Sequence, residues 1–240
     1  MSDRLDKAVQ ALTRGLEAAL GDRLASLVLY GSVARGTHVP GRSDANVLLI
    51  VTDAGAAVLR LAAPPLAAWS RAGYPPPLIH TPAEWAAAAD VYPLEVEDIR
   101  EAHRVLAGRD PVEGVTTNRG DQLRELEHQA RGLLLHLRGR YGALASDPRA
   151  LAALLSGSVG AVLVFCRAAL RLAGQTIPRQ PEAVAAEAGV LAGFDEGAFR
   201  WAIEARRETK ARLEAYDERG SAYLASVERL VGWVDGLEKR

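Results

Sequence analysis

The sequence predicts an α+β protein in which a small mixed-sheet domain is followed by an all-α helical bundle. Three observations lead to this prediction. Short apolar runs of strand character alternate with helical segments in the first half. The second half shows helical periodicity and no convincing strand. Pro, Gly and Thr cluster between the halves, near residues 110–118, so we expect domains at residues 1–115 and 119–240.

The first half is expected to begin with a helix at residues 4–20, where leucines and a valine recur at helical spacing before Gly21. Strands are predicted wherever a short apolar run is bounded by turn formers, at residues 24–30, 46–51, 78–80 and 94–96. Further helices are predicted at residues 54–72 (interrupted at Pro64 and Pro65), 82–90 and 98–107.

The second half is expected to form helices joined at Pro148, Pro178 and Pro181. Their predicted ranges are 121–145, 148–173, 181–192, 195–218 and 221–237. Residues 150–166 are uncharged and apolar but short for a bilayer span of about 20 residues, so we interpret them as a buried bundle helix.

Composition narrows the classes of function. The formal net charge of −1 excludes a strongly basic protein that coats nucleic acid, and a nucleic-acid partner is not favoured. A single cysteine excludes an internal disulfide and a cysteine-based zinc site. Because no secretory signal is visible, we expect a cytoplasmic protein with no membrane partner; a homo-oligomer is left open.

The segment LVLYGSVARG at residues 27–36 is the first part of the candidate site. Gly31 has no Cβ, so a phosphate can approach the backbone, and Ser32 offers a hydroxyl and an N–H group. Arg35 could supply a cation to the same phosphate. Arg42, which flanks the next strand, is another candidate phosphate contact. These residues predict a nucleotide-binding corner.

The second part is SDANVLLI at residues 43–50. Side chains alternate along a strand, so Asp44 and Asn46 are expected on one face, as a carboxylate and an amide oxygen. A hard cation that bridges phosphates prefers such oxygens, so both residues are candidate metal ligands.

Together these two segments resemble the nucleotidyltransferase superfamily, which includes DNA polymerase β-like and aminoglycoside-modifying enzymes. Gly31-Ser32, Ala34-Arg35-Gly36 and Ser43-Asp44 carry the resemblance. It implies transfer of a nucleoside monophosphate from a nucleoside triphosphate to a hydroxyl group. It also implies Mg²⁺ or Mn²⁺ as the cofactor.

The sequence departs from the superfamily pattern at Asn46, where the second metal-binding carboxylate is expected. An amide contributes a neutral oxygen and no charge, which weakens a Mg²⁺ site. Glu95 is our first candidate for the third carboxylate and for the general base, by resemblance to a segment of aminoglycoside adenylyltransferases. Asp98 is the second candidate, with a helix N-cap as its alternative role.

Two functional hypotheses follow. The first is a metal-dependent nucleotidyltransferase that acts on a hydroxyl of a small molecule or macromolecule, with Asp44 and Glu95 as catalytic residues. The second is a catalytically degenerate fold that binds nucleotide or acts as a regulatory or antitoxin-like protein, and Asn46 is the residue that favours it.

Overall fold

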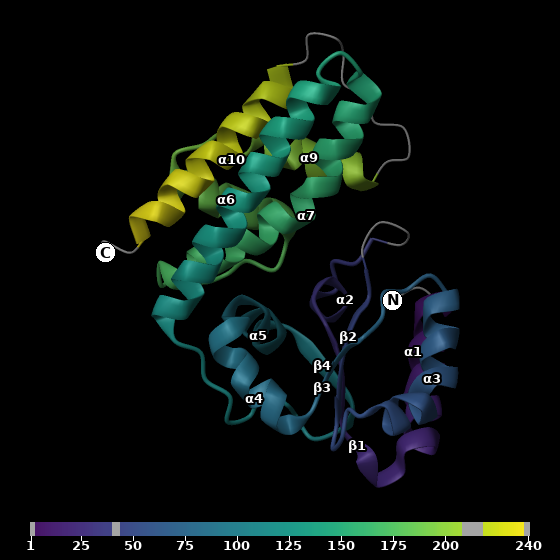
Figure 1. The fold of residues 1–240 in the computed structure, drawn as a ribbon. Coiled ribbons are helices and arrows are strands. Elements are labelled where there is room, and N and C mark those ends of the chain that lie inside the picture. The colour runs from purple at the N-terminus through teal and green to yellow at the C-terminus, as the bar shows by residue number, and fades with distance from the viewer. Residues whose placement is uncertain (1–2, 40–43, 208–217, 238–240) are drawn as a thin grey trace. The chain divides into compact units, whose positions relative to one another are not determined.

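A computed structural model of the chain describes residues 3–39, 44–207 and 218–237. The chain divides into two compact units, Met1–Asn118 and Arg119–Arg240. The first is a sheet with helices on both faces and the second is helical, so the predicted α+β class is confirmed (Figure 1).

The sheet of the first unit has the strand order β3-β2-β1-β4. The strands are β1 (Leu24–Tyr30), β2 (Asn46–Val51), β3 (Leu78–His80) and β4 (His103–Gly108). β1 is antiparallel to both β2 and β4, whereas β2 is parallel to β3. The strands predicted at residues 24–30, 46–51 and 78–80 are confirmed, and the sheet is mixed.

Helices cover both faces of this sheet (Figure 1). α1 (Asp3–Leu20) and α3 (Ala56–Arg71) lie on one face, in a core with Leu27, Leu29 and Leu49. α4 (Pro82–Val91) and α5 (Pro93–Glu101) lie on the other, in a core with Val28, Tyr30 and Leu48. β1 and β2 therefore carry apolar residues almost continuously, as strands buried on both faces do.

The predicted interruption of the helix at Pro64 and Pro65 is wrong, because α3 runs through both prolines. A Cβ placed on Gly15 of α1 would lie 2.8 Å from Cβ of Pro65. The proline therefore packs directly on α1 at a glycine, and this helix contact offsets the loss of a backbone donor within α3.

The region after residue 92 also differs from the prediction. Residues 94–96 lie within α5 rather than in a strand, because Pro93 occupies the first helical turn, where its missing N–H costs nothing. The helix predicted at residues 98–107 ends at Glu101, and β4 follows at once. Residues 103–108 form a strand because they pair with β1 from Tyr30 to Ser26, along the edge of β1 that does not pair with β2.

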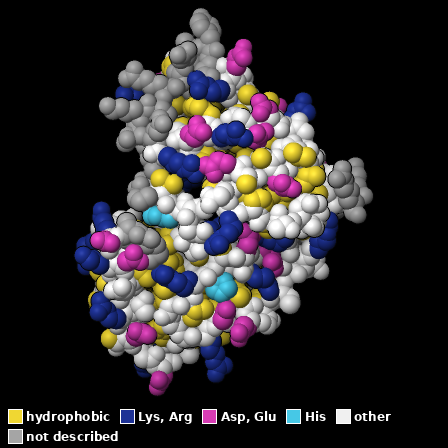
Figure 2. Space-filling view, turned by 180° about the vertical axis from the view of Figure 1, so that it is seen from behind, with side chains coloured by type: hydrophobic (Ala, Val, Ile, Leu, Met, Phe, Trp, Pro, Cys, Tyr) yellow, Lys and Arg dark blue, Asp and Glu magenta, His cyan; other side chains and the backbone are white. Residues whose placement is uncertain are grey.

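The second unit is built around α7 (Pro148–Leu172), which packs against its neighbours and contributes much of their shared core. Its other helices are α6 (Arg119–Leu144), α8 (Pro181–Ala192), α9 (Gly197–Arg207) and α10 (Glu218–Gly236). By length and composition, α7 alone among the described helices could cross a membrane, and half of its most apolar window is buried in this unit. On the face drawn in Figure 2, acidic and basic side chains of the described residues are interspersed.

Short α2 (Ser32–Arg35) and the 3₁₀ turn η1 (Gly21–Arg23) complete the first unit and lie at opposite ends of β1. α2 is the element that begins the candidate site.

Replacing Gly108 with alanine should disrupt the junction between β4 and β1. Gly108 has φ +76°, and an added Cβ would lie 2.1 Å from the Ala25 carbonyl oxygen. Gly114 is the matched control, because it has φ +77° and open space around the added atom. We expect Gly108→Ala to lower the free energy of unfolding by at least about 2 kcal/mol more than Gly114→Ala, whose backbone strain alone costs about 1 kcal/mol. Urea unfolding followed by circular dichroism measures both, and equal losses would contradict the described register.

Candidate functional site

The Gly31 corner, formed by Gly31 and Ser32 at the end of β1, is the first part of the site. Gly31 adopts φ +73°, which favours glycine, and its N–H donates to the Ala102 carbonyl at 3.2 Å. A Cβ at Gly31 would lie 3.2 Å from Nδ2 of Asn46. α2 begins at Ser32, so the first N–H groups of this helix lack carbonyl partners within it. The corner thus places Gly31 beside the Asn46 amide, and α2 begins there with N–H groups that have no carbonyl partner within the helix.

Asn46 is the first residue of β2 and pairs with Tyr30 of β1. By strand alternation its side chain is on the same face as Leu48, which is the face covered by α4 and α5. Asp44 precedes the strand and is exposed. The beginning of β2 and the end of β1 therefore meet at one end of the sheet.

Tyr30 connects this end of the sheet to α5. Its hydroxyl donates to Oε1 of Glu95 at 2.8 Å. Burial raises the pKa of Tyr30 far above its usual value, and the negative charges of Glu95 and Asp98 raise it further. The phenol therefore stays protonated and serves as a permanent donor to the Glu95 carboxylate.

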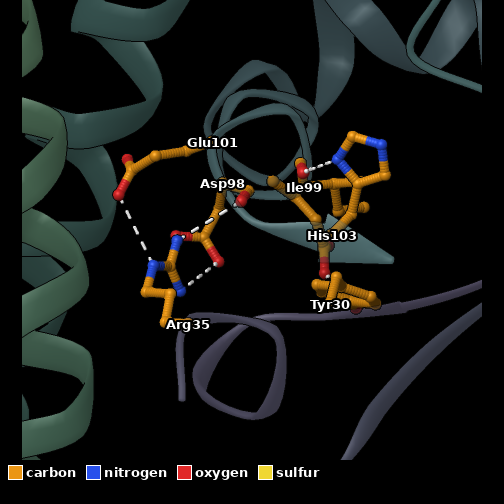
Figure 3. Close-up of polar contacts among 7 residues, drawn as sticks. Tyr30, Arg35, Asp98, Ile99, Glu101 and His103 are labelled. Atoms are coloured by element: carbon orange, nitrogen blue, oxygen red, sulfur yellow. Dashed lines mark hydrogen bonds and ion pairs between the residues drawn. The ribbon is translucent and has the colours of Figure 1, made fainter. Parts of the chain in front are cut away.

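Arg35 lies inside the first unit, and its side chain is 7% exposed. Its guanidinium pairs with the Asp98 carboxylate at 2.5 Å and with the Glu101 carboxylate at 3.4 Å, and it also donates to the Asp98 carbonyl (Figure 3). These bonds tie the end of α2 to α5, the helix that carries Glu95. The predicted phosphate contact of Arg35 is not tested by this structure, but its observed contacts are with protein carboxylates.

The remaining predicted site residues are Glu95, Asp98 and Arg42. Glu95 and Asp98 both lie within α5, so the strand position expected for Glu95 and the N-cap role considered for Asp98 are wrong. The cap is at Tyr92, because Pro93 begins the helix. Arg42 lies outside the described residues.

Sequence reasoning missed Tyr30. The available signal was the position of Tyr30, which ends an apolar strand directly before Gly31. Once β1 pairs with β2, Tyr30 lies opposite Asn46, and both side chains are on the same face of the sheet. That signal could not be used without the register of β1 against β2 and the position of α5.

The donors present do not fit a resident pair of metal ions. Within the described residues no group of three His, Cys, Asp or Glu side chains is placed to hold a metal. Each carboxylate of α5 already has a partner in its own unit: Glu95 has Tyr30, Glu97 has Thr117 and Arg100, and Asp98 and Glu101 share Arg35. Asp44 remains as an exposed carboxylate at the start of β2, and the role predicted for Asn46 as a metal ligand stays a prediction.

Comparison with known proteins adds a structural likeness. No protein-family model and no curated protein matches the sequence. The fold is similar to the crystal structure of spectinomycin adenyltransferase AAD(9) from Enterococcus faecialis with ATP and spectinomycin. The TM-score is 0.58 and the identity is 12%, over 95% of this chain and 98% of that one. The chain therefore has the nucleotidyltransferase fold with a helical C-terminal region.

Removing the Arg35 guanidinium should destabilise the first unit, because two partly buried carboxylates lose their ion pairs with it. We expect Arg35→Met to lower the free energy of unfolding by about 3 kcal/mol. The control is Arg71→Met on α3, where the arginine is exposed and the change should be within about 0.5 kcal/mol. Urea unfolding measures both variants, and equal stabilities would show that Arg35 does not hold α2 on α5.

Proposed function

We propose that the protein binds a nucleoside triphosphate at the Gly31 corner and transfers its nucleoside monophosphate to a hydroxyl group of a second molecule. The observation that carries this proposal is the position of Tyr30. Tyr30 precedes Gly31, pairs with Asn46 and donates to Glu95. Tyr30 thus connects the Gly31 corner, the start of β2 and a carboxylate.

The roles follow from the chemistry of transfer. The acceptor oxygen attacks the α-phosphorus, the bond from this phosphorus to the bridging oxygen breaks, and pyrophosphate leaves with the bonding electrons. The acceptor proton passes to Glu95, the candidate general base. Tyr30 occupies Oε1 of Glu95, and no described group hydrogen-bonds with Oε2, which is therefore open to the proton.

Gly31 and Ser32 would hold the phosphates that become pyrophosphate, through backbone N–H groups and the Ser32 hydroxyl. We assign Mg²⁺ to the nucleotide substrate, as the counter-ion of its phosphates, with Asp44 as its protein carboxylate. When bound, the ion would draw negative charge from the phosphates. Arg42 stays a candidate phosphate contact of this proposal.

The structural likeness supports ATP as the nucleotide and a hydroxyl-bearing small molecule as the acceptor. The similar structure contains ATP and spectinomycin, and its fold covers nearly the whole of both chains. An identity of 12% supports the shared fold only, so the acceptor has to be identified by experiment.

The test is pyrophosphate release from ATP and other nucleoside triphosphates, with spectinomycin, other aminoglycosides, RNA 3′ ends and proteins as acceptors. Asp44→Ala should lower the rate at least about a hundredfold, because it removes the exposed carboxylate at the phosphates. Glu95→Gln should lower it by about 10² to 10⁴, because the amide keeps the Tyr30 bond but is no base.

Two matched controls separate these effects from general damage. Asp22→Ala changes an exposed aspartate in η1, and Glu97→Gln changes a carboxylate on the same helix as Glu95. Both should retain the wild-type rate within about threefold. Release that survives Asp44→Ala and Glu95→Gln would contradict the assigned site.

Nucleotide binding without transfer, in a regulatory or antitoxin-like role, is the second candidate function. Asn46 favours it, because this position carries an amide where a metal-binding carboxylate is needed for fast transfer. Tight ATP binding with no pyrophosphate release for any acceptor would select this function over the first.

A further inference from the structure

The candidate site has a neutral amide where the resemblance calls for a metal-binding carboxylate. We propose that the Asn46 amide donates directly to a nucleotide phosphate at the Gly31 corner, so that nucleotide binding does not require a divalent cation. This inference rests on the proposed nucleotide site and concerns the form in which that site takes its nucleotide.

The position of Asn46 is the first support. Its Nδ2 lies 3.2 Å from the place that a Cβ would occupy on Gly31, so the amide lies directly against the Gly31 corner. Its backbone is fixed by pairing with Tyr30 at the start of β2. An amide held at this point can reach a phosphate oxygen that approaches the Gly31 backbone.

The second support is that this amide is unused. No group of the described chain makes a hydrogen bond with the Asn46 side chain, although the residue is half-buried. A half-buried amide gains stability when its N–H groups find acceptors. A phosphate oxygen is a strong acceptor of this kind, because its charge strengthens the bond.

The third support is the charge around the corner. A carboxylate at residue 46 would repel a triphosphate unless a cation stood between them, whereas an amide attracts the phosphate by itself. The carboxylates of α5 do not supply a cation site in its place, since Tyr30, Arg35, Arg100 and Thr117 hold them within the first unit. The amide at residue 46 therefore leaves Asp44 as the exposed carboxylate at the start of β2, and it makes phosphate binding depend less on a cation than a second carboxylate would.

The test compares ATP affinity by isothermal titration calorimetry in excess Mg²⁺ and in excess EDTA. For the wild-type protein we expect the two dissociation constants to agree within about threefold. Asn46→Asp should bind ATP at least about tenfold more weakly in EDTA than in Mg²⁺, because the restored carboxylate repels the phosphates until a cation intervenes. Asn46→Ala should lose about tenfold in both conditions, because it lacks the donor.

Gln10→Glu is the matched control for the added charge. It makes the same change of amide to carboxylate on α1, which covers the opposite face of the sheet from Asn46. Its two dissociation constants should follow those of the wild type, and thermal unfolding should show every variant folded.

The outcomes separate this inference from the proposed function. Wild-type binding that disappears in EDTA and returns with Mg²⁺ would overturn the inference and leave the nucleotide site in place. Absence of ATP binding in both conditions would overturn the nucleotide site itself, and the inference with it. Equal behaviour of Asn46→Asp and wild type would show that residue 46 does not face the phosphates.

Discussion

A buried guanidinium fixes the arrangement of the candidate site. Arg35 cannot leave water without anionic partners, because an isolated buried charge is strongly unfavourable. Asp98 and Glu101 supply those partners from one face of α5. The short α2 has few hydrogen bonds of its own, so this ion pair decides where its end lies and also holds α5 beside β1. Glu95 stands one turn before Asp98, and its position over Tyr30 depends on the same bonds.

The fold of the first unit was predictable where strand and helix periodicities agreed with local turn signals. β1, β2 and β3 could be found because apolar runs end at Gly31, at Thr52-Asp53 and near His80. The region after residue 92 could not, because its local signals conflict. Pro93 starts a helix, and Ala102 ends it only because β4 then gains hydrogen bonds along β1. Such long-range pairing is invisible in one sequence.

The candidate site was predictable only where its residues carry a local signal. Gly31 and Ser32 are recognisable from a strand that ends in Gly-Ser, and Asp44 and Asn46 from the strand that follows. The partners of Arg35 and the contact of Tyr30 with Glu95 span more than sixty positions of sequence. Nothing in the local pattern distinguishes an arginine that binds phosphate from one that binds a protein carboxylate. Only the position of α5 decides which contact forms.

The charges of α5 and of Asn46 form one consistent pattern. α5 carries four carboxylates, and each is bound by a donor of its own unit. In a site that clamps two metal ions, some of these carboxylates would have to stay open, and residue 46 would add another. Here the neutral amide at residue 46 and the bonded carboxylates of α5 both differ from what two metal ions would need. An amide at residue 46 is therefore in keeping with its surroundings rather than an isolated loss from an otherwise intact metal centre.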